Sequence, residues 1–158
     1  PKNRIDLLYH KGSKIDVIGA SYVDFHTNVF PSDHGMIAAT YQWNATLSLD
    51  KSTYSVGKPI VASFTDGPGN PNDWIGIYSN PGNGPSNCAP GPGNVTTWLY
   101  VNGTQSGSGN ITEGRVSFDN ENRQVAPKWP LPAGDYIAHI LKDNGYCDLG
   151  TAVPFRIE

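Results

Sequence analysis

Two aspartates and one histidine near the start of the chain carry the side chains needed for acid–base chemistry. Asp6 follows Arg4-Ile5 in a short apolar run, and Asp33 and His34 stand next to each other just before another such run. A carboxylate bonded to one imidazole nitrogen fixes the tautomer of the ring and favours its charged form, so the other nitrogen can take or give a proton. A second carboxylate beside such a pair suits a hard cation such as Mg²⁺. An ordinary surface hydrogen bond between Asp6 and His34 is the alternative interpretation.

These side chains can meet only if the segments around them are neighbouring strands. Three short apolar runs predict strands: residues 4–9, 15–25 and 36–41. If these strands share a sheet, Asp6 and His34 can approach each other at one edge. Continuous apolar runs are typical of strands that are covered on both faces, which needs more protein than residues 1–43 contain. We therefore expect this segment to be ordered only beside a further piece of protein.

The motifs of this segment resemble those of a known family. An R-I-D motif at residues 4–6 is followed by a second strand, and then by an S-D-H motif at residues 32–34 that leads into a last strand. This order resembles the C-terminal end of the endonuclease/exonuclease/phosphatase superfamily, which includes deoxyribonucleases, sphingomyelinases and inositol phosphatases. The resemblance covers residues 4–42, and it implies an α/β four-layer phosphoesterase domain of which these are the last strands.

The resemblance also implies roles for three residues. His34 would be the catalytic histidine beside the scissile phosphate, Asp6 would orient it, and Asp33 would help to hold a divalent metal ion or its water. The implied reaction is hydrolysis of a phosphate ester of nucleic acid, phospholipid or inositol phosphate type, in which Mg²⁺ or another divalent cation offsets charge on the phosphate oxygens. The family's principal metal-binding Glu and its Asn and Asp ligands lie upstream of the matched region, and this chain contains none of them. We therefore expect the intact enzyme to use Mg²⁺, and this chain alone to be inactive and to hold no cofactor. The expected partner is the missing N-terminal part of the catalytic domain, as a second chain or a cleaved fragment.

The rest of the chain predicts a second domain of a different kind. Seven short strands separated by turn residues, with no helical periodicity, predict an antiparallel β-sandwich: residues 46–50, 58–65, 74–78, 97–101, 114–119, 134–142 and 152–157. The motifs D-W-I-G-I-Y and L-P-A-G-D-Y within residues 54–157 resemble an Ig-like or SKICH-like sandwich that is appended to some phosphoesterases. The predicted fold is therefore mainly β, with the phosphoesterase strands in residues 1–43 and an Ig-like accessory sandwich in residues 44–158.

The aromatic residues of the sandwich have two interpretations. Seven of them could form a platform for a sugar or a lipid head group: Trp74, Tyr78, Trp98, Tyr100, Trp129, Tyr136 and Tyr146. The favoured alternative is that they fill the core, because sandwich cores are built from such residues. Trp74 and Tyr78 alternate along one strand and share a face with Gly76, and Trp129 is expected to be the most exposed. Three aspartates that could bind Ca²⁺ are interpreted as turn residues: Asp73, Asp143 and Asp148. The sequence Asp143-Asn144-Gly145 predicts a hairpin turn.

Cysteines, sequons and charge together favour a secreted protein. Cys88 and Cys147 are the only cysteines, so they fit one disulfide, with two free thiols as the alternative. A bridge between them would contribute about 3–4 kcal/mol in the chain-entropy model. Four Asn-x-Thr sequons predict glycosylation: Asn44, Asn94, Asn102 and Asn110.

With 11 basic and 14 acidic residues and a net charge of −3, the chain has no basic patch for nucleic acid. No apolar run is long enough for a transmembrane segment.

The leading prediction is thus the C-terminal portion of a secreted, divalent-metal-dependent phosphoesterase with an accessory sandwich. The alternative is a non-catalytic sandwich module that binds carbohydrate or lipid, with residues 1–43 as a remnant. A third possibility is a purely structural domain that covers one end of the catalytic domain.

Overall fold

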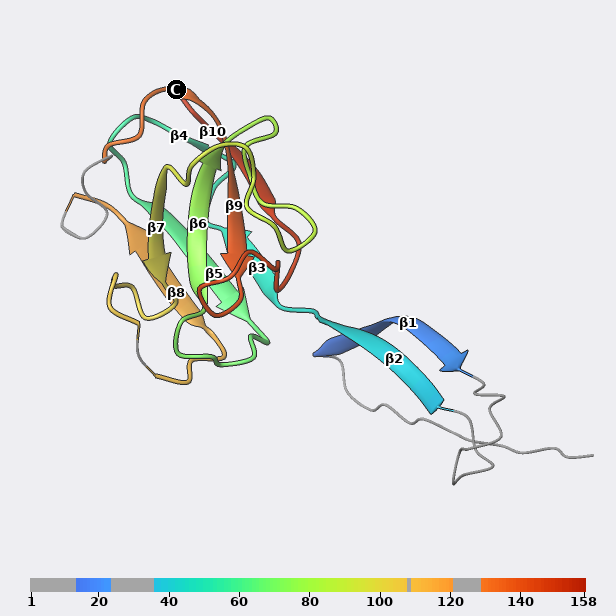
Figure 1. Cartoon of the computed structure of the whole chain (residues 1–158). Helices are drawn as coiled ribbons and strands as arrows, with labels where there is room; N and C mark the ends of the chain where they lie inside the picture. Colours follow the sequence, from blue (N-terminus) through green and yellow to red (C-terminus); the bar gives the residue numbers. More distant parts are fainter. Residues whose placement is uncertain (1–13, 24–35, 108, 121–128) are drawn as a thin grey trace, which may run out of the picture. The chain divides into compact units, whose positions relative to one another are not determined.

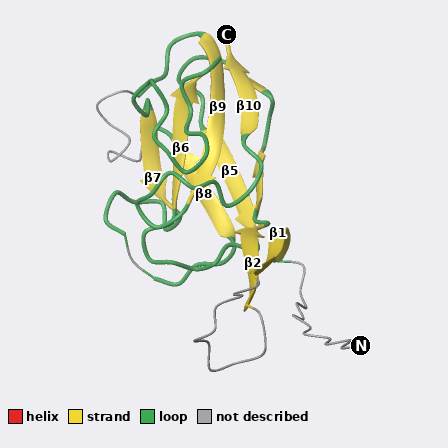
Figure 2. Ribbon diagram, turned by 45° about the vertical axis from the view of Figure 1, so that its right-hand side comes forward, coloured by secondary structure: helices red, strands yellow, loops and turns green. Residues whose placement is uncertain are grey.

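The described part of the chain consists of strands and loops. The computed structural model describes residues 14–23, 36–107, 109–120 and 129–158, and within them there is no helix (Figures 1 and 2). None of these residues therefore belongs to a helix that could span a membrane. The chain divides into two compact units, residues 1–42 and residues 43–158. We call them the N-terminal unit and the sandwich unit.

The N-terminal unit contains a two-stranded sheet. Its strands are β1, Ile15–Val23, and β2, Met36–Trp43, at the positions where the apolar runs predict strands. The third predicted strand, residues 4–9, lies outside the described residues. Val17 and Ile18 are 48% and 60% exposed. Because successive strand residues point to opposite faces, both faces of β1 present an apolar side chain to solvent.

The sandwich unit contains two sheets. One sheet has the strand order β4-β10-β9-β6-β7, and the other has the order β3-β5-β8 (Figure 1). Seven of the eight strands coincide with the strands predicted from the sequence. Their bounds are Thr46–Leu49 for β3, Thr53–Tyr54 for β4, Ile60–Thr65 for β5, Trp74–Ser79 for β6, Thr97–Tyr100 for β7, Gly114–Phe118 for β8, Gly134–Leu141 for β9 and Val153–Ile157 for β10.

Strand β4 is the element that sequence patterning does not reveal. It is only two residues long, and it pairs in parallel with β10, whereas the other pairs of strands described in the unit are antiparallel. Tyr54 is buried there, and its hydroxyl donates a hydrogen bond of 2.6 Å to Asp50. Two residues are too few to show an alternating pattern, so this strand depends on the presence of β10 beside it.

The main hydrophobic core lies on the inner face of the five-stranded sheet, against the three-stranded sheet. In β6 the inward residues are Ile75 and Ile77, which are completely buried, and Phe64 and Phe118 meet them from the other sheet. This alternation of inward and outward residues is what a β-sandwich-like arrangement requires. Tyr136 also belongs to this core, and Trp129 packs partly buried against it. The expectation that Trp129 is the most exposed aromatic residue is therefore wrong.

Trp74 and Tyr78 are buried but do not lie in the core between the sheets. They form a second cluster with Leu141, against which Trp98 and Tyr100 pack. Since β6 alternates, the burial of Ile75 and Ile77 on the inner face places Trp74 and Tyr78 on the outer face. The interpretation of these aromatics as sandwich core is thus wrong in location, although burial itself is confirmed.

Candidate functional site

The outer face of the five-stranded sheet carries an aromatic cluster that is separate from the main core. Its rings meet edge to face: Trp74 and Trp98 at 6.1 Å, Trp98 and Tyr100 at 5.1 Å, and Trp74 and Tyr146 at 6.2 Å between ring centroids. Aromatic pairs prefer such geometry because the positive ring edge faces the negative ring surface. We call Trp74, Trp98, Tyr100 and Tyr146 the outer aromatic cluster.

Gly76 makes this arrangement possible. It lies between Trp74 and Tyr78 on the outer face of β6, in register with Trp98 of β7 and His139 of β9. A methyl group at this position would lie 2.7 Å from the Trp74 ring and 3.0 Å from the Tyr78 ring. The two rings therefore close over a site where only hydrogen fits, so glycine here is required by packing.

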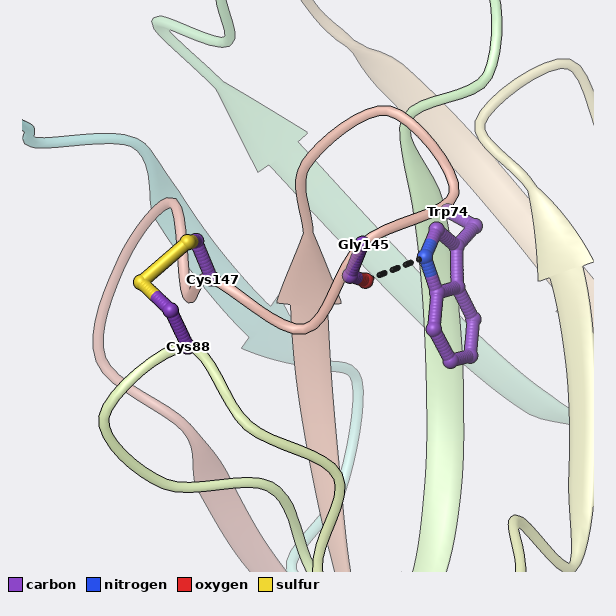
Figure 3. Close-up of a disulfide and its surroundings, with 4 residues drawn as sticks. All are labelled: Trp74, Cys88, Gly145 and Cys147. Carbon is purple, nitrogen blue, oxygen red and sulfur yellow. Dashed lines mark hydrogen bonds between the residues drawn. A yellow bond between two sulfur atoms is a disulfide. The ribbon is translucent and has the colours of Figure 1, made fainter.

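A tight turn after β9 supplies one wall of the site. Asp143 and Asn144 adopt φ values of 42° and 60°, and the Gly145 N–H donates to the Lys142 carbonyl. Two consecutive residues with positive φ are the mark of the hairpin turn that the Asp-Asn-Gly sequence predicts. The turn is joined to the sheet by Trp74, whose Nε1 donates to the Gly145 carbonyl at 3.1 Å, as Figure 3 shows.

The Cys88–Cys147 disulfide joins this turn to the long loop between β6 and β7 (Figure 3). The predicted pairing is therefore confirmed. Cys88 also forms an isolated β-bridge with Tyr146, so backbone and covalent contacts hold the same two loops together. Because Tyr146 directly precedes Cys147, the disulfide restrains one member of the outer aromatic cluster.

Two adjoining hollows open on this face. The small hollow, of about 250 Å³, is lined by Trp74, Val95, Trp98, Tyr100, Asn144 and Tyr146. The large hollow, of about 380 Å³, is lined by Trp74, Tyr78, Pro90, Gly91, Gly93, Asn94, Val95 and Tyr146. The hollows share three lining residues, and none of the residues that line either one is charged. We call the two hollows together the outer groove. Apolar walls with a few polar groups are typical of sites for small organic ligands.

Two polar groups next to the outer groove have no hydrogen-bond partner among the described residues. Tyr78 is 2% exposed and lines the large hollow, and its hydroxyl has no partner among the described residues. Burial, followed by the nearby Tyr146 and Asp148, raises the pKa of this hydroxyl. Beside it, His139 holds Asp148 through Nδ1 at 2.8 Å, while its buried Nε2 is also without a partner. A buried hydroxyl without a partner costs about 1–3 kcal/mol.

Asp73 serves the turn rather than a metal. It is 1% exposed and accepts hydrogen bonds from the backbone N–H groups of Asn70 and Asp143 and from the Asn70 side chain, each at 3.0 Å. Burial raises the pKa of its carboxyl group, while these donors act in the opposite direction. The interpretation of Asp73 and Asp143 as turn residues fits this network. Within the described ranges no three acidic, histidine or cysteine side chains come close enough to hold a metal ion.

The residues predicted for phosphoesterase chemistry lie elsewhere. Asp6, Asp33 and His34 fall outside the described residues, so the structure does not show whether they come together. His34 stands two residues before β2, and Asp33 directly before it. The prediction that these residues form a site therefore stays a prediction.

The four sequons differ in how accessible their side chains are. Asn44, Asn94 and Asn110 are exposed. Asn102 is half-buried, its side-chain amide donates to the Ser106 carbonyl at 2.9 Å, and its oxygen accepts from Thr104. A sugar on Asn102 would have to break the bond that its nitrogen makes, so the other three positions suit glycosylation better.

The aromatic residues of this face can be recognised in the sequence, but the groove cannot. Asn94, Val95 and Asn144 line it, and they come from loops whose position depends on the disulfide. The alternation along β7 indicated an aromatic face, because Trp98 and Tyr100 lie on one face of the strand and Leu99 lies on the other. Comparison with known proteins finds no family model, no curated protein and no solved structure that matches this chain.

Proposed function

We propose that this chain is the C-terminal portion of a secreted, divalent-metal-dependent phosphoesterase of the endonuclease/exonuclease/phosphatase type, with an Ig-like accessory sandwich. The observation that carries the proposal is the S-D-H motif at residues 32–34, preceded by the R-I-D motif at residues 4–6. It is supported by the pairing of β1 with β2, since the motif occupies the segment that leads into β2. The disulfide is compatible with a secreted protein.

The exposed apolar residues of β1 support a partner for the N-terminal unit. Val17 and Ile18 point to opposite faces and are both about half exposed. A two-stranded sheet is at best marginally stable in water, so a layer on each face would remove apolar surface from solvent and stabilise it. The proposed partner is the rest of the catalytic domain, which would supply that layer together with the remaining metal ligands.

In this proposal His34 takes or gives a proton at the phosphate ester, and Asp6 orients its ring. A bound Mg²⁺ would offset negative charge on the phosphate oxygens. Of this chain's residues only Asp33 is assigned to the metal, and one carboxylate does not make a site for Mg²⁺. The proposed metal site is therefore completed by residues of the catalytic partner, and no step of the reaction is assigned to the ion here.

The test is hydrolysis of a chromogenic phosphate diester and a chromogenic phosphate monoester by the enzyme assembled with its catalytic partner. His34→Ala should lower kcat/KM by about 10²–10⁴-fold, the usual contribution of a positioned acid or base. His26→Ala, in the same segment but outside the motif, serves as the control and should retain wild-type turnover. A His34→Ala enzyme with wild-type turnover would refute the assignment.

The outer groove favours a second candidate function, that of a non-catalytic binding module. This function needs no metal and no partner, because all of the lining residues belong to the sandwich unit. Tryptophan fluorescence provides a direct test, since Trp74 and Trp98 line the groove. A titration with neutral oligosaccharides and with phosphatidylcholine vesicles should give a saturable change in emission with one of them. No change with either would leave the groove without a binding role.

A further inference from the structure

We propose that the outer groove binds two neighbouring rings of a neutral sugar chain. The inference rests on the second candidate function, that of a binding module, and specifies its ligand class. Three properties of the groove support it: the absence of charged lining residues, the combination of aromatic rings with amide groups, and the division into two adjoining hollows.

The electrostatics of the groove favour a neutral ligand. No Asp, Glu, Lys, Arg or His lines either hollow. A phosphate head group, a nucleic-acid backbone or an acidic sugar would have to give up water there without meeting an opposite charge, which is costly. Sugar hydroxyls, in contrast, need only neutral hydrogen-bond donors and acceptors.

The lining chemistry matches the two sides of a pyranose ring. Such a ring presents C–H groups on its faces and hydroxyl groups around its rim. Trp98 and Tyr100, both partly exposed, offer apolar ring surface in the small hollow, and Tyr146, 37% exposed, borders both hollows. The Asn144 and Asn94 amides lie in the walls of the small and the large hollow, where hydroxyl groups would meet them. The Asn144 oxygen also accepts a hydrogen bond from the Tyr100 hydroxyl at 2.7 Å, so this amide and this ring are held together on one wall.

The two hollows suit two successive rings. They share the lining residues Trp74, Val95 and Tyr146, so they are neighbours on this face, and a ligand of two rings would place one ring in each. Tyr78 also lines the large hollow, although its hydroxyl is buried beneath the surface of the hollow.

The test uses the full 158-residue chain, produced in a bacterial periplasm so that the disulfide forms and Asn94 carries no glycan. Calorimetry and tryptophan fluorescence are recorded with hexamers of β-1,3-glucan, β-1,4-glucan, xylan, mannan and chitin. We expect saturable binding of at least one hexamer. We also expect its disaccharide to bind at least tenfold more tightly than its monosaccharide, because only the disaccharide spans both hollows.

Variants identify the groove as the site. Trp98→Ala and Tyr146→Ala should each weaken binding by about tenfold or more, the usual effect of truncating an aromatic anchor. Tyr41→Ala is the matched control, because Tyr41 is 38% exposed and lines neither hollow, and it should leave affinity unchanged.

Three outcomes would overturn the inference. These are no binding across the whole panel, binding that Trp98→Ala and Tyr146→Ala leave unchanged, and binding of phosphatidylcholine vesicles or a proline-rich peptide in place of sugar. In the last case, loss of binding in Trp98→Ala would keep a binding function for the groove and reject only the sugar. None of these experiments measures phosphate-ester hydrolysis, so a negative binding result does not bear on the phosphoesterase proposal.

Discussion

The two faces of the five-stranded sheet are built from the same strands but by different means. On the inner face, Ile75 and Ile77 pack against a second sheet and are completely buried. On the outer face, Trp74 and Tyr78 are covered by loops, which are held in place by a disulfide and a tight turn. The inner face therefore stabilises the fold, while the outer face leaves room for the groove. The comparison teaches that buried aromatic residues need not belong to the main core.

The largest expected effect comes from truncating the inner face. Ile77→Ala should lower the free energy of unfolding by about 2–5 kcal/mol, because the site is completely buried and cannot collapse around the lost atoms. Urea unfolding followed by circular dichroism measures it. Groove ligands should bind the fraction that remains folded with unchanged affinity. A loss of less than about 1 kcal/mol in the free energy of unfolding would contradict the conclusion that the inner face stabilises the fold.

Loss of the disulfide should affect the outer face. The double variant Cys88→Ser, Cys147→Ser should be about 2–4 kcal/mol less stable, since its unfolded chain is less restrained. It should also bind groove ligands more weakly, because Tyr146 is no longer fixed. Thermal unfolding with and without a reductant measures the first effect. Reduced wild-type protein is the control and should match the double variant.

Adding a methyl group at Gly76 tests how closely the Trp74 and Tyr78 rings pack around this position. Gly76→Ala should cost about 1–3 kcal/mol, because the added methyl group collides with the Trp74 and Tyr78 rings. Gly19→Ala is the control, since its nearest neighbouring atom would be 3.9 Å away. Equal stability of the two variants by chemical denaturation would show that the rings can separate without cost.

The smallest expected change in stability comes from removing one hydroxyl group. Tyr78→Phe should raise the free energy of unfolding by about 1 kcal/mol, because it removes a buried hydroxyl that has no partner among the described residues. Differential scanning calorimetry of the free protein measures this change. A clear loss of stability would show that the hydroxyl has a hydrogen-bond partner in the free protein.

Much of the sandwich unit follows from local patterns in the sequence. Alternating apolar residues between turn signals predict seven of its eight strands, and the Asp-Asn-Gly turn adopts the predicted geometry. The disulfide was predictable because the chain has only two cysteines. Strand β4 was not, because a two-residue element has no pattern of its own and exists through its pairing with β10.

The residues of the candidate site could be predicted only in part, and their arrangement could not be predicted. Alternation along β6 shows that Trp74, Gly76 and Tyr78 share a face, but not which face meets the second sheet. That choice depends on where β3, β5 and β8 pack, which is a tertiary property. The residues expected to perform phosphoesterase chemistry, Asp6, Asp33 and His34, remain a prediction from motifs alone.

The positions of seven strands of the sandwich unit, the turn and the covalent link follow from the sequence, because each depends on neighbours in the chain or on a unique pair of residues. Only the tertiary structure decided that the aromatic residues of β6 and β7 face outward, and that the Cys88 loop and the Tyr146 turn enclose a groove above them. The reason is physical: period-two alternation divides a strand into two faces that are chemically equivalent until another layer packs on one of them.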